Sequence, residues 1–217
     1  NSKKLFGVIS VITLFIILST SFYFGYIYSV FNTDFHHYSI ILETYLDKKN
    51  GFELNKDIFV TYGNGQIYLF EFLSNFFSIN LFSVGIINQF FFFFKFLVFF
   101  FILKFFFDNF FSLIGTLIYY FFYTFLQTAS SDILASFFLH LFILIYLYNS
   151  QKQKMNYIVL SGILVFLTIL FRHTYILNWI IFIFTLIVLN FFISNDLKYE
   201  KKIIKYFLLV TGAYFIF

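Results

Sequence analysis

The sequence contains no cysteine and no proline, and it has few charged residues. Without cysteine there is no disulfide bond, no catalytic thiolate and no thiol-ligated metal site. For the same reason the sequence does not indicate whether the protein lies in an oxidising or a reducing compartment. Only 11% of the 217 residues are charged, whereas 61% are hydrophobic. This composition is far more apolar than a soluble domain can enclose in one core, so it predicts an integral membrane protein.

Apolar segments recur along the chain at the length that a membrane-crossing helix requires. Such a helix needs about 20 predominantly apolar residues, and phenylalanine, with 42 residues, supplies much of the apolar bulk. We therefore predict an all-α fold, a polytopic transmembrane helix bundle of about seven spans. The predicted spans are 5–31, 82–104, 109–126, 132–149, 157–172, 175–193 and 203–217.

The basic residues predict the orientation of these spans, because cytoplasmic loops carry an excess of lysine and arginine. We expect the amino terminus and segments 151–154 and 196–205 in the cytoplasm, and segments 32–65, 127–131 and 172–175 on the extracytoplasmic face of the plasma or inner membrane. The net charge of +4 thus reports orientation, and no nucleic-acid partner is predicted. The bases expected inside are Lys3, Lys4, Lys104, Lys152, Lys154, Lys198, Lys201, Lys202 and Lys205.

The first extracytoplasmic loop, residues 32–65, is the largest predicted segment outside the membrane. Within it, residues 40–46 have the apolar spacing of a helix lying along the interface, residues 48–51 suit a turn, and the glycines of 61–65 suit a loop closure. Residues 66–80 are predicted as a second, partly polar helix. The loop is therefore expected to contain interfacial helices.

The two ends of the sequence lead us to expect a fragment. The chain begins with Asn1 rather than methionine, and its last residues lie inside an apolar segment. We expect residues 1–217 to form a single transmembrane domain from the amino-terminal part of a longer protein.

Asp34 follows the first predicted span at the membrane surface, and His36 and His37 come next. A carboxylate there suits a general base for a hydroxyl acceptor, or a ligand for a divalent cation that binds phosphate; alternatively, it caps the next helix. Adjacent histidines point about 100° apart on a helix, which argues against a two-histidine zinc site. One histidine is a candidate for binding a phosphate oxygen or orienting Asp34; the alternative is a solvated interfacial side chain.

Two later connections bring Asp132, Arg172 and His173 to the same predicted face. An acid at the membrane edge usually has a partner or a function, although Asp132, after two serines, also suits the first turn of a helix. A guanidinium pairs bidentately with phosphate, so Arg172 is a candidate contact for a lipid phosphate. The alternative is an interfacial arginine that reaches back to water.

The sequence indicates no definite role for three other ionisable residues. Lys95 lies well inside the second predicted span, where it must face the bundle interior or extend along the helix to water. His140 is expected to be a hydrogen-bonded packing residue. Glu71 either lines the outer site or solvates the polar face of its helix.

The first span, the D-F-H-H segment at 34–37, the segment KNGFELNKDIFVTYGNG and the ending LSNFFSIN together resemble the start of polytopic glycosyltransferases of the GT-C class. Members of this class, which includes the dolichyl-phosphate-mannose and ArnT-like transferases, use a polyprenyl-phosphate sugar as donor. The resemblance implies a bundle of many spans with its active site in the outer loops. Asp34-Phe35 departs from the two consecutive acids of many members.

Residue by residue, the resemblance implies that Asp34 is a catalytic or metal-organising acid and that Asp132 is a second catalytic acid. The substrate-binding residues that it implies are His36, His37, Asp57, Tyr62, Arg172 and His173. We therefore predict a membrane glycosyltransferase that moves a sugar from a polyprenyl-phosphate donor to a glycan, lipid or protein acceptor. The alternatives are a transporter or flippase of lipid-linked or amphipathic substrates, and a structural membrane subunit.

Overall fold

The computed structural model of the protein describes residues 2–30, 35–60, 62–125, 130–152 and 155–193. Within these ranges the chain is helical and contains no strand, which confirms the predicted all-α class. The helices are α1 (Ser2–Val30), α2 (Phe35–Lys49), α3 (Asn64–Leu73), α4 (Leu81–Leu103), α5 (Asn109–Phe125), α6 (Ser130–Lys152), α7 (Met155–Phe171) and α8 (Tyr175–Ile193).

Six of the segments predicted as spans are single helices with nearly the predicted bounds. The segment 203–217 lies outside the described residues. Two helical stretches in the described part of the chain, Leu81–Leu103 and Ser131–Asn149, are long and apolar enough to cross a membrane, judged by length and composition.

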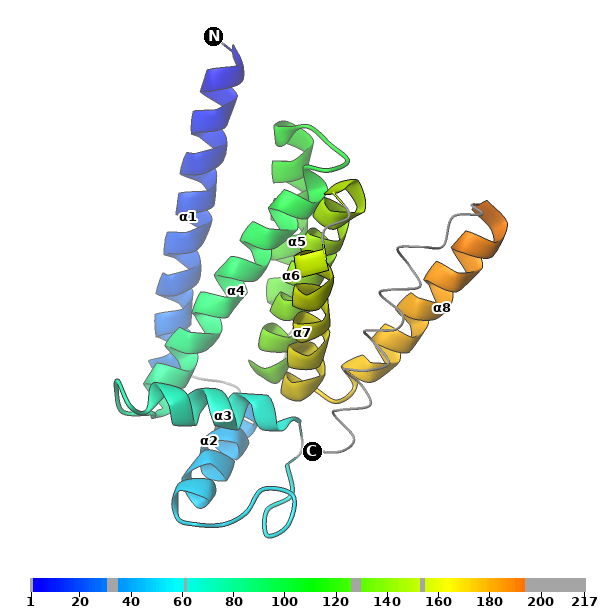
Figure 1. Ribbon diagram of the computed structural model, residues 1–217. Coiled ribbons are helices and arrows are strands. Elements are labelled where there is room, and N and C mark those ends of the chain that lie inside the picture. The colour runs from blue at the N-terminus through cyan, green and yellow to red at the C-terminus, as the bar shows by residue number, and fades with distance from the viewer. Residues whose placement is uncertain (1, 31–34, 61, 126–129, 153–154, 194–217) are drawn as a thin grey trace.

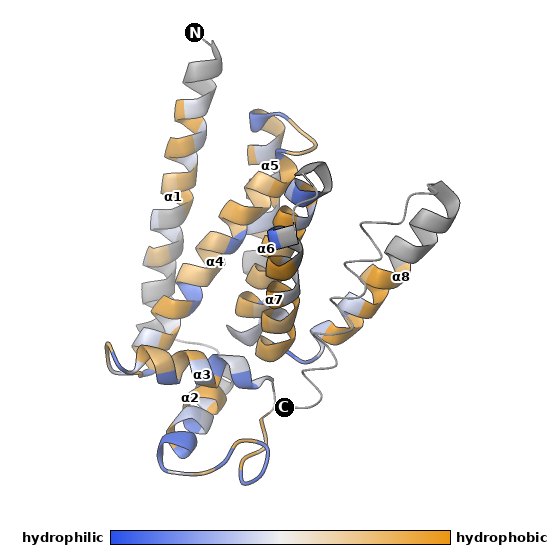
Figure 2. Ribbon diagram, viewed as in Figure 1, coloured by the Kyte–Doolittle hydropathy of each residue, from blue (hydrophilic) through white to orange (hydrophobic). Residues whose placement is uncertain are grey.

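The long helices run alternately up and down (Figure 1). The start of α1, the α4–α5 connection, the end of α6 and the start of α7 lie at one end of the bundle, which we call the amino-terminal end. Helices α2 and α3 and the α7–α8 turn, residues 172–174, lie at the opposite end, which we call the loop end. Figure 2 shows the polar residues gathered in α2 and the loop that follows it.

Helix α4 lies at the centre of the bundle. Its first turn is fixed by a capping box, in which the Asn80 side chain accepts the Ser83 N–H at 3.0 Å and the Ser83 hydroxyl accepts the Asn80 N–H at 2.8 Å. Further along, Phe92 and Phe96 pack against Tyr120 of α5 with ring centroids 5.8 and 5.1 Å apart. Residues of four helices, α1, α4, α5 and α6, form this cluster: Ile17, Phe92, Phe96, Tyr120 and Ile133.

A second cluster joins α6, α7 and the start of α8. Trp179, which is 1% exposed, packs edge-on against Phe142 with ring centroids 4.4 Å apart. Leu164, Val165 and Ile169 of α7 complete the cluster. Phe182, further along α8, also packs on Phe142 with ring centroids 5.4 Å apart, and the remainder of α8 diverges from the bundle (Figure 1).

At the loop end, α2 and α3 pack on the start of α4 through Ile41, Tyr45, Ile67, Phe70, Val84 and Ile87. The two helices predicted in this region are therefore present, but the second is shorter than expected. Helix α3 ends at Leu73 because Ser74 and Asn75 bond back to the helix: the Ser74 hydroxyl to the Glu71 carbonyl at 2.7 Å, the Asn75 amide to the Phe72 carbonyl at 3.1 Å. Such bonds compete with helix continuation.

Candidate functional site

Arg172 follows the last residue of α7 and is held by the turn that reverses the chain into α8. Its N–H bonds to the Thr168 carbonyl at 3.1 Å, and its carbonyl accepts the Tyr175 N–H at 3.1 Å. The backbone of Arg172 is therefore fixed on both sides, at the loop end of the bundle.

The guanidinium of Arg172 forms an ion pair with Asp132 in the first turn of α6. The distance from Nη1 to Oδ2 is 2.8 Å, and the side chains are 23% and 22% exposed. The same Nη1 donates to the Ser131 hydroxyl at 3.3 Å, and Nε donates to the Thr174 hydroxyl at 3.2 Å. Nη2 makes no hydrogen bond to any side chain or carbonyl of the described residues.

Tyr62 brings the first loop onto this pair. The guanidinium carbon of Arg172 lies 5.3 Å from the centre of the Tyr62 ring, and the Tyr62 carbonyl accepts the His173 N–H at 3.3 Å. A cation over an aromatic face is stabilised by the ring quadrupole. The loop therefore contacts both the side chain and the backbone of the α7–α8 turn.

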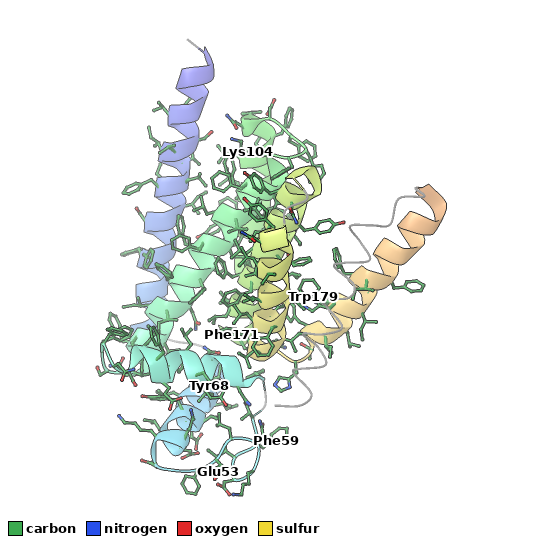
Figure 3. All side chains as sticks on the ribbon, viewed as in Figure 1. Glu53, Phe59, Tyr68, Lys104, Phe171 and Trp179 are labelled. Carbon is green, nitrogen blue, oxygen red and sulfur yellow. The ribbon has the colours of Figure 1, made fainter. Side chains whose placement is uncertain are left out.

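Two glycines allow this close approach. A Cβ added to Gly63 would lie 2.5 Å from the Leu170 carbonyl oxygen and 2.7 Å from that of Phe171, and a Cβ on Gly65 would lie 3.0 Å from the Leu170 carbonyl. Figure 3 shows Phe171 at the end of α7 that faces α3. The Y-G-N-G motif thus has a packing reason, because only a residue without a side chain fits against this helix end.

The structure therefore brings together four of the predicted site residues: Tyr62 of the loop, Asp132 of α6, and Arg172 and His173 of the α7–α8 turn. These residues are far apart in the sequence, and they meet at one end of the bundle. The sequence analysis missed Ser131 and Thr174, which also bond to Arg172; the only signal was that each adjoins or nearly adjoins a predicted site residue.

His173 is exposed, but partial desolvation of its imidazole lowers the pKa below its usual value. The imidazole is therefore neutral at pH 7. As a ligand-binding residue, His173 would offer a neutral hydrogen-bonding group rather than a second positive charge.

Of the other predicted site residues, Asp57 is the one whose side chain the structure describes. Asp57 is exposed, and its carboxylate accepts the Glu53 N–H at 2.8 Å, which closes the loop after α2. Asp34 lies outside the described residues, as do the side chains of His36 and His37, whose backbone begins α2. In the part of the chain that the structure describes, no group of three or more metal-ligating side chains gathers.

Glu71 has a different partner from the predicted site. Its carboxylate pairs with Lys48 of α2, and the Lys48 ammonium also lies 4.5 Å from the centre of the Tyr68 ring. Figure 3 shows Tyr68 on α3, beside α2. This ion pair links α2 to α3. Glu71 therefore lies on the polar face of α3 and does not line the Arg172 cluster.

Lys95 and His140 lie in the interior of the bundle. Lys95 is fully buried, which settles its predicted position in favour of the interior. The Nδ1 atom of His140 bonds to the Ser136 carbonyl at 2.5 Å, and the ring stacks on Tyr119 with centroids 5.7 Å apart. His140 is thus the hydrogen-bonded packing residue that the sequence predicted.

Comparisons with known proteins identify no relative: no family model matches the chain, and no curated protein and no solved structure is significantly similar to it. The functional argument therefore depends on the residues of this chain.

Proposed function

We propose that this protein is an integral membrane glycosyltransferase that moves a sugar from a polyprenyl-phosphate donor to a glycan, lipid or protein acceptor. One observation carries the proposal: Asp132, Arg172 and Tyr62, from three separate segments, meet at the loop end of the bundle. Asp132 and Ser131 hold the Arg172 guanidinium through Nη1. A guanidinium held in place in this way is suited to bind a phosphate group through its other N–H groups.

The surface of the bundle supports a membrane location. Large apolar side chains are exposed on helices at its periphery, which is unfavourable in water on this scale but required in lipid. On α1 they are Val8, Ile9, Val11, Ile12, Phe15 and Ile16; on α5, Phe110, Phe111, Ile114, Ile118, Phe121 and Phe122; on α8, Leu177, Ile180, Ile181 and Phe184. Together with the two sufficiently long apolar helices, they support the proposed location in a membrane.

The proposed orientation rests on the basic residues of the whole sequence, of which nine are expected at the amino-terminal end and four, Lys48, Lys49, Lys56 and Arg172, at the loop end. Lys104, labelled in Figure 3, lies at the amino-terminal end of the bundle, and Lys3, Lys4 and Lys152 belong to helix ends on that side. The positive-inside rule would place this end in the cytoplasm and the loop end outside. A lipid-borne sugar on the outer face would then meet Arg172.

The proposed reaction assigns a role to each charged group. A hydroxyl oxygen of the acceptor attacks the anomeric carbon of the sugar, the bond from that carbon to the phosphate oxygen breaks, and its electron pair leaves with the polyprenyl phosphate. Arg172 stabilises the departing phosphate through Nη2. Asp132 already holds the guanidinium, so we propose that it orients Arg172 and that Asp34 accepts the hydroxyl proton.

The rival function is a transporter or flippase of the same class of lipid. One observation favours it: Lys95 is buried in the bundle, and ionisable side chains inside membrane segments often mark substrate or proton pathways. The ionised cluster at the loop end would then bind and release a lipid phosphate without bond breaking.

A vesicle assay separates the two functions. The full chain is reconstituted with a radiolabelled polyprenyl-phosphate sugar in the outer leaflet and a mixture of glycan and lipid acceptors. A new glycosidic product supports the transferase, whereas movement of the intact donor between leaflets without product supports transport. Vesicles that show neither would overturn both functions.

A further inference from the structure

A groove lies at the amino-terminal end of the bundle, between the end of α4 and the last turns of α6. Its volume is about 560 Å³, within the range of about 300–1,000 Å³ that is usual for small organic ligands. The groove is lined by Phe101, Lys104, Phe105, Leu144, Ile145 and Tyr148. It is therefore large enough to hold part of a lipid molecule.

The walls of the groove are mostly apolar, and α6 holds one side of it in place. Ile145 packs on the core cluster around Trp179, and the Tyr148 ring packs edge-on against Tyr157 of α7 with ring centroids 5.3 Å apart. On the other side, Phe101 of α4 is 44% exposed. In a membrane, a groove of this kind favours a hydrocarbon tail, because a flexible chain can make many van der Waals contacts along it.

Lys104 adds a positive charge to this apolar groove. Its side chain is exposed, and the ammonium lies 6.0 Å from the centre of the Phe100 ring. Asp108, the acid closest to it in the sequence, caps α5 instead: its Oδ1 accepts the N–H groups of Phe110 and Phe111, each at 3.0 Å. Lys104 forms no ion pair with a carboxylate of the described residues. The ammonium can therefore pair with an anionic ligand in the groove.

The polar and apolar residues of the groove are at different heights along the two helices. Lys104 follows Phe101 by about one turn, and Tyr148 follows Leu144 by about one turn, in both cases toward the amino-terminal end of the bundle. Tyrosine and lysine are the residues that membrane helices place at the level of the lipid headgroups. The groove thus has the polarity of a phospholipid, with its polar part at the membrane surface.

We propose that this groove binds one anionic phospholipid, with its phosphate paired to the Lys104 ammonium and an acyl tail along Phe101 and Leu144. Charge complementarity selects an anionic headgroup, because an ammonium group at the membrane surface attracts anionic lipids. The proposed orientation places this end in the cytoplasmic leaflet, where such lipids concentrate. The inference rests on the membrane location proposed above, but not on sugar transfer. The groove and Arg172 lie at opposite ends of the bundle, so this lipid is not the donor.

The first measurement is a lipid titration of the full chain in detergent, followed by native mass spectrometry. Phosphatidylglycerol and phosphatidylcholine with identical acyl tails are added separately, and glycerol phosphate is added as a headgroup without a tail. The first phosphatidylglycerol is expected to bind about fivefold more tightly than phosphatidylcholine, and an equal concentration of glycerol phosphate should not displace it. Equal affinities for the two lipids, or displacement by glycerol phosphate, would overturn the site.

The second measurement repeats the titrations with Lys104→Gln. This change is expected to lower the affinity for phosphatidylglycerol about fivefold and to leave phosphatidylcholine binding unchanged. Lys49→Gln, which removes an exposed lysine at the loop end, is the matched control and should change neither affinity. Binding of phosphatidylglycerol by Lys104→Gln at the affinity of the unmodified protein would overturn the role of Lys104.

The third measurement tests the apolar part of the groove. Leu144→Trp fills the groove and is expected to weaken the binding of both phospholipids; if this variant does not fold, Leu144→Phe replaces it with the same expected result. Unchanged binding of both lipids would overturn the groove as the site of the tail. A lipid-free dimer of the unmodified protein that dissociates in the Leu144 variant would assign the groove to a second copy of the chain and overturn the lipid site.

The inference and the proposed function fail separately. A protein that binds phosphatidylglycerol through Lys104 but transfers no sugar retains the lipid site and loses the transferase. A protein that transfers sugar but binds the two phospholipids equally retains the transferase and loses the lipid site.

Discussion

Replacing Gly63 by alanine is expected to push the Tyr62 loop away from the end of α7. The new Cβ would lie 2.5 Å from the Leu170 carbonyl oxygen and 2.7 Å from the Phe171 carbonyl oxygen. Both atoms belong to the backbone of a helix end, so neither can rotate away. Ordinary van der Waals contact requires about 3.5 Å, and the loop must therefore move by about 1 Å.

This displacement has a calculable cost. Overpacking of this kind costs about 1–3 kcal/mol, and each kcal/mol lowers the melting temperature of a chain of this length by about 2–4 °C. The displacement also weakens the contact of the Tyr62 ring with the Arg172 guanidinium, now at 5.3 Å. Phosphate binding should therefore decrease together with stability.

The assay follows thermal unfolding through the fluorescence of Trp179, the single tryptophan of the chain. Gly115→Ala is the matched control, because its new Cβ would meet only Cδ1 of Leu103, the movable end of a side chain, at 2.8 Å. We expect a smaller loss of stability for Gly115→Ala than for Gly63→Ala and no change in phosphate binding. A Gly63→Ala protein with unchanged melting temperature and phosphate affinity would refute the close packing of the loop on α7.

Three further predictions follow from the ionisable residues of the loop end. Asp132→Asn and Arg172→Gln should each lower the free energy of unfolding by about 1–3 kcal/mol, because each change leaves a half-buried charge unpaired. The double variant should lose less than the sum of the two single losses. Additive losses in chemical denaturation would contradict the ion pair. Lys48→Gln removes the partner of the exposed Glu71 carboxylate and should cost less than about 1 kcal/mol, so a larger loss in the same assay would contradict a surface pair. Desolvation lowers the pKa of His173, so its imidazole is uncharged at pH values above that pKa. His173→Gln should therefore bind prenyl phosphate within about twofold of the unmodified protein, and the affinity of the unmodified protein should stay constant between about pH 7 and 8. A fall in affinity over that interval would show that a charged imidazole takes part in binding.

The helices could be predicted from the sequence because the length of an apolar segment is a local property. Each of the six predicted spans in the described residues is one helix with nearly the expected bounds. The end of α3 was predicted wrongly, at Asn80 rather than Leu73. There the apolar pattern continues, but Ser74 and Asn75 bond back to the helix and end it, a competition that the apolar pattern does not reveal.

The candidate site could be predicted only in part. Topology placed Asp132 and Arg172 on the same face, but no local pattern indicates that they form an ion pair or that Tyr62 covers the guanidinium. These contacts join segments that are distant in the sequence, and they depend on how α6, α7 and the loop pack. The sequence predicts that the two glycines of the Y-G-N-G motif close a loop, and the structure shows that they also allow backbone to approach backbone.

The central claim is that Arg172 binds the phosphate of the donor lipid at the loop end of the bundle. Sugar transfer in reconstituted vesicles tests this claim most directly. The measurement compares the unmodified protein, Arg172→Gln, and Lys49→Gln as a control that removes an exposed cation from α2 at the same end. We predict that Arg172→Gln lowers the rate of product formation by about a hundredfold or more, while Lys49→Gln leaves it unchanged. Transfer by Arg172→Gln at the rate of the unmodified protein would contradict the account.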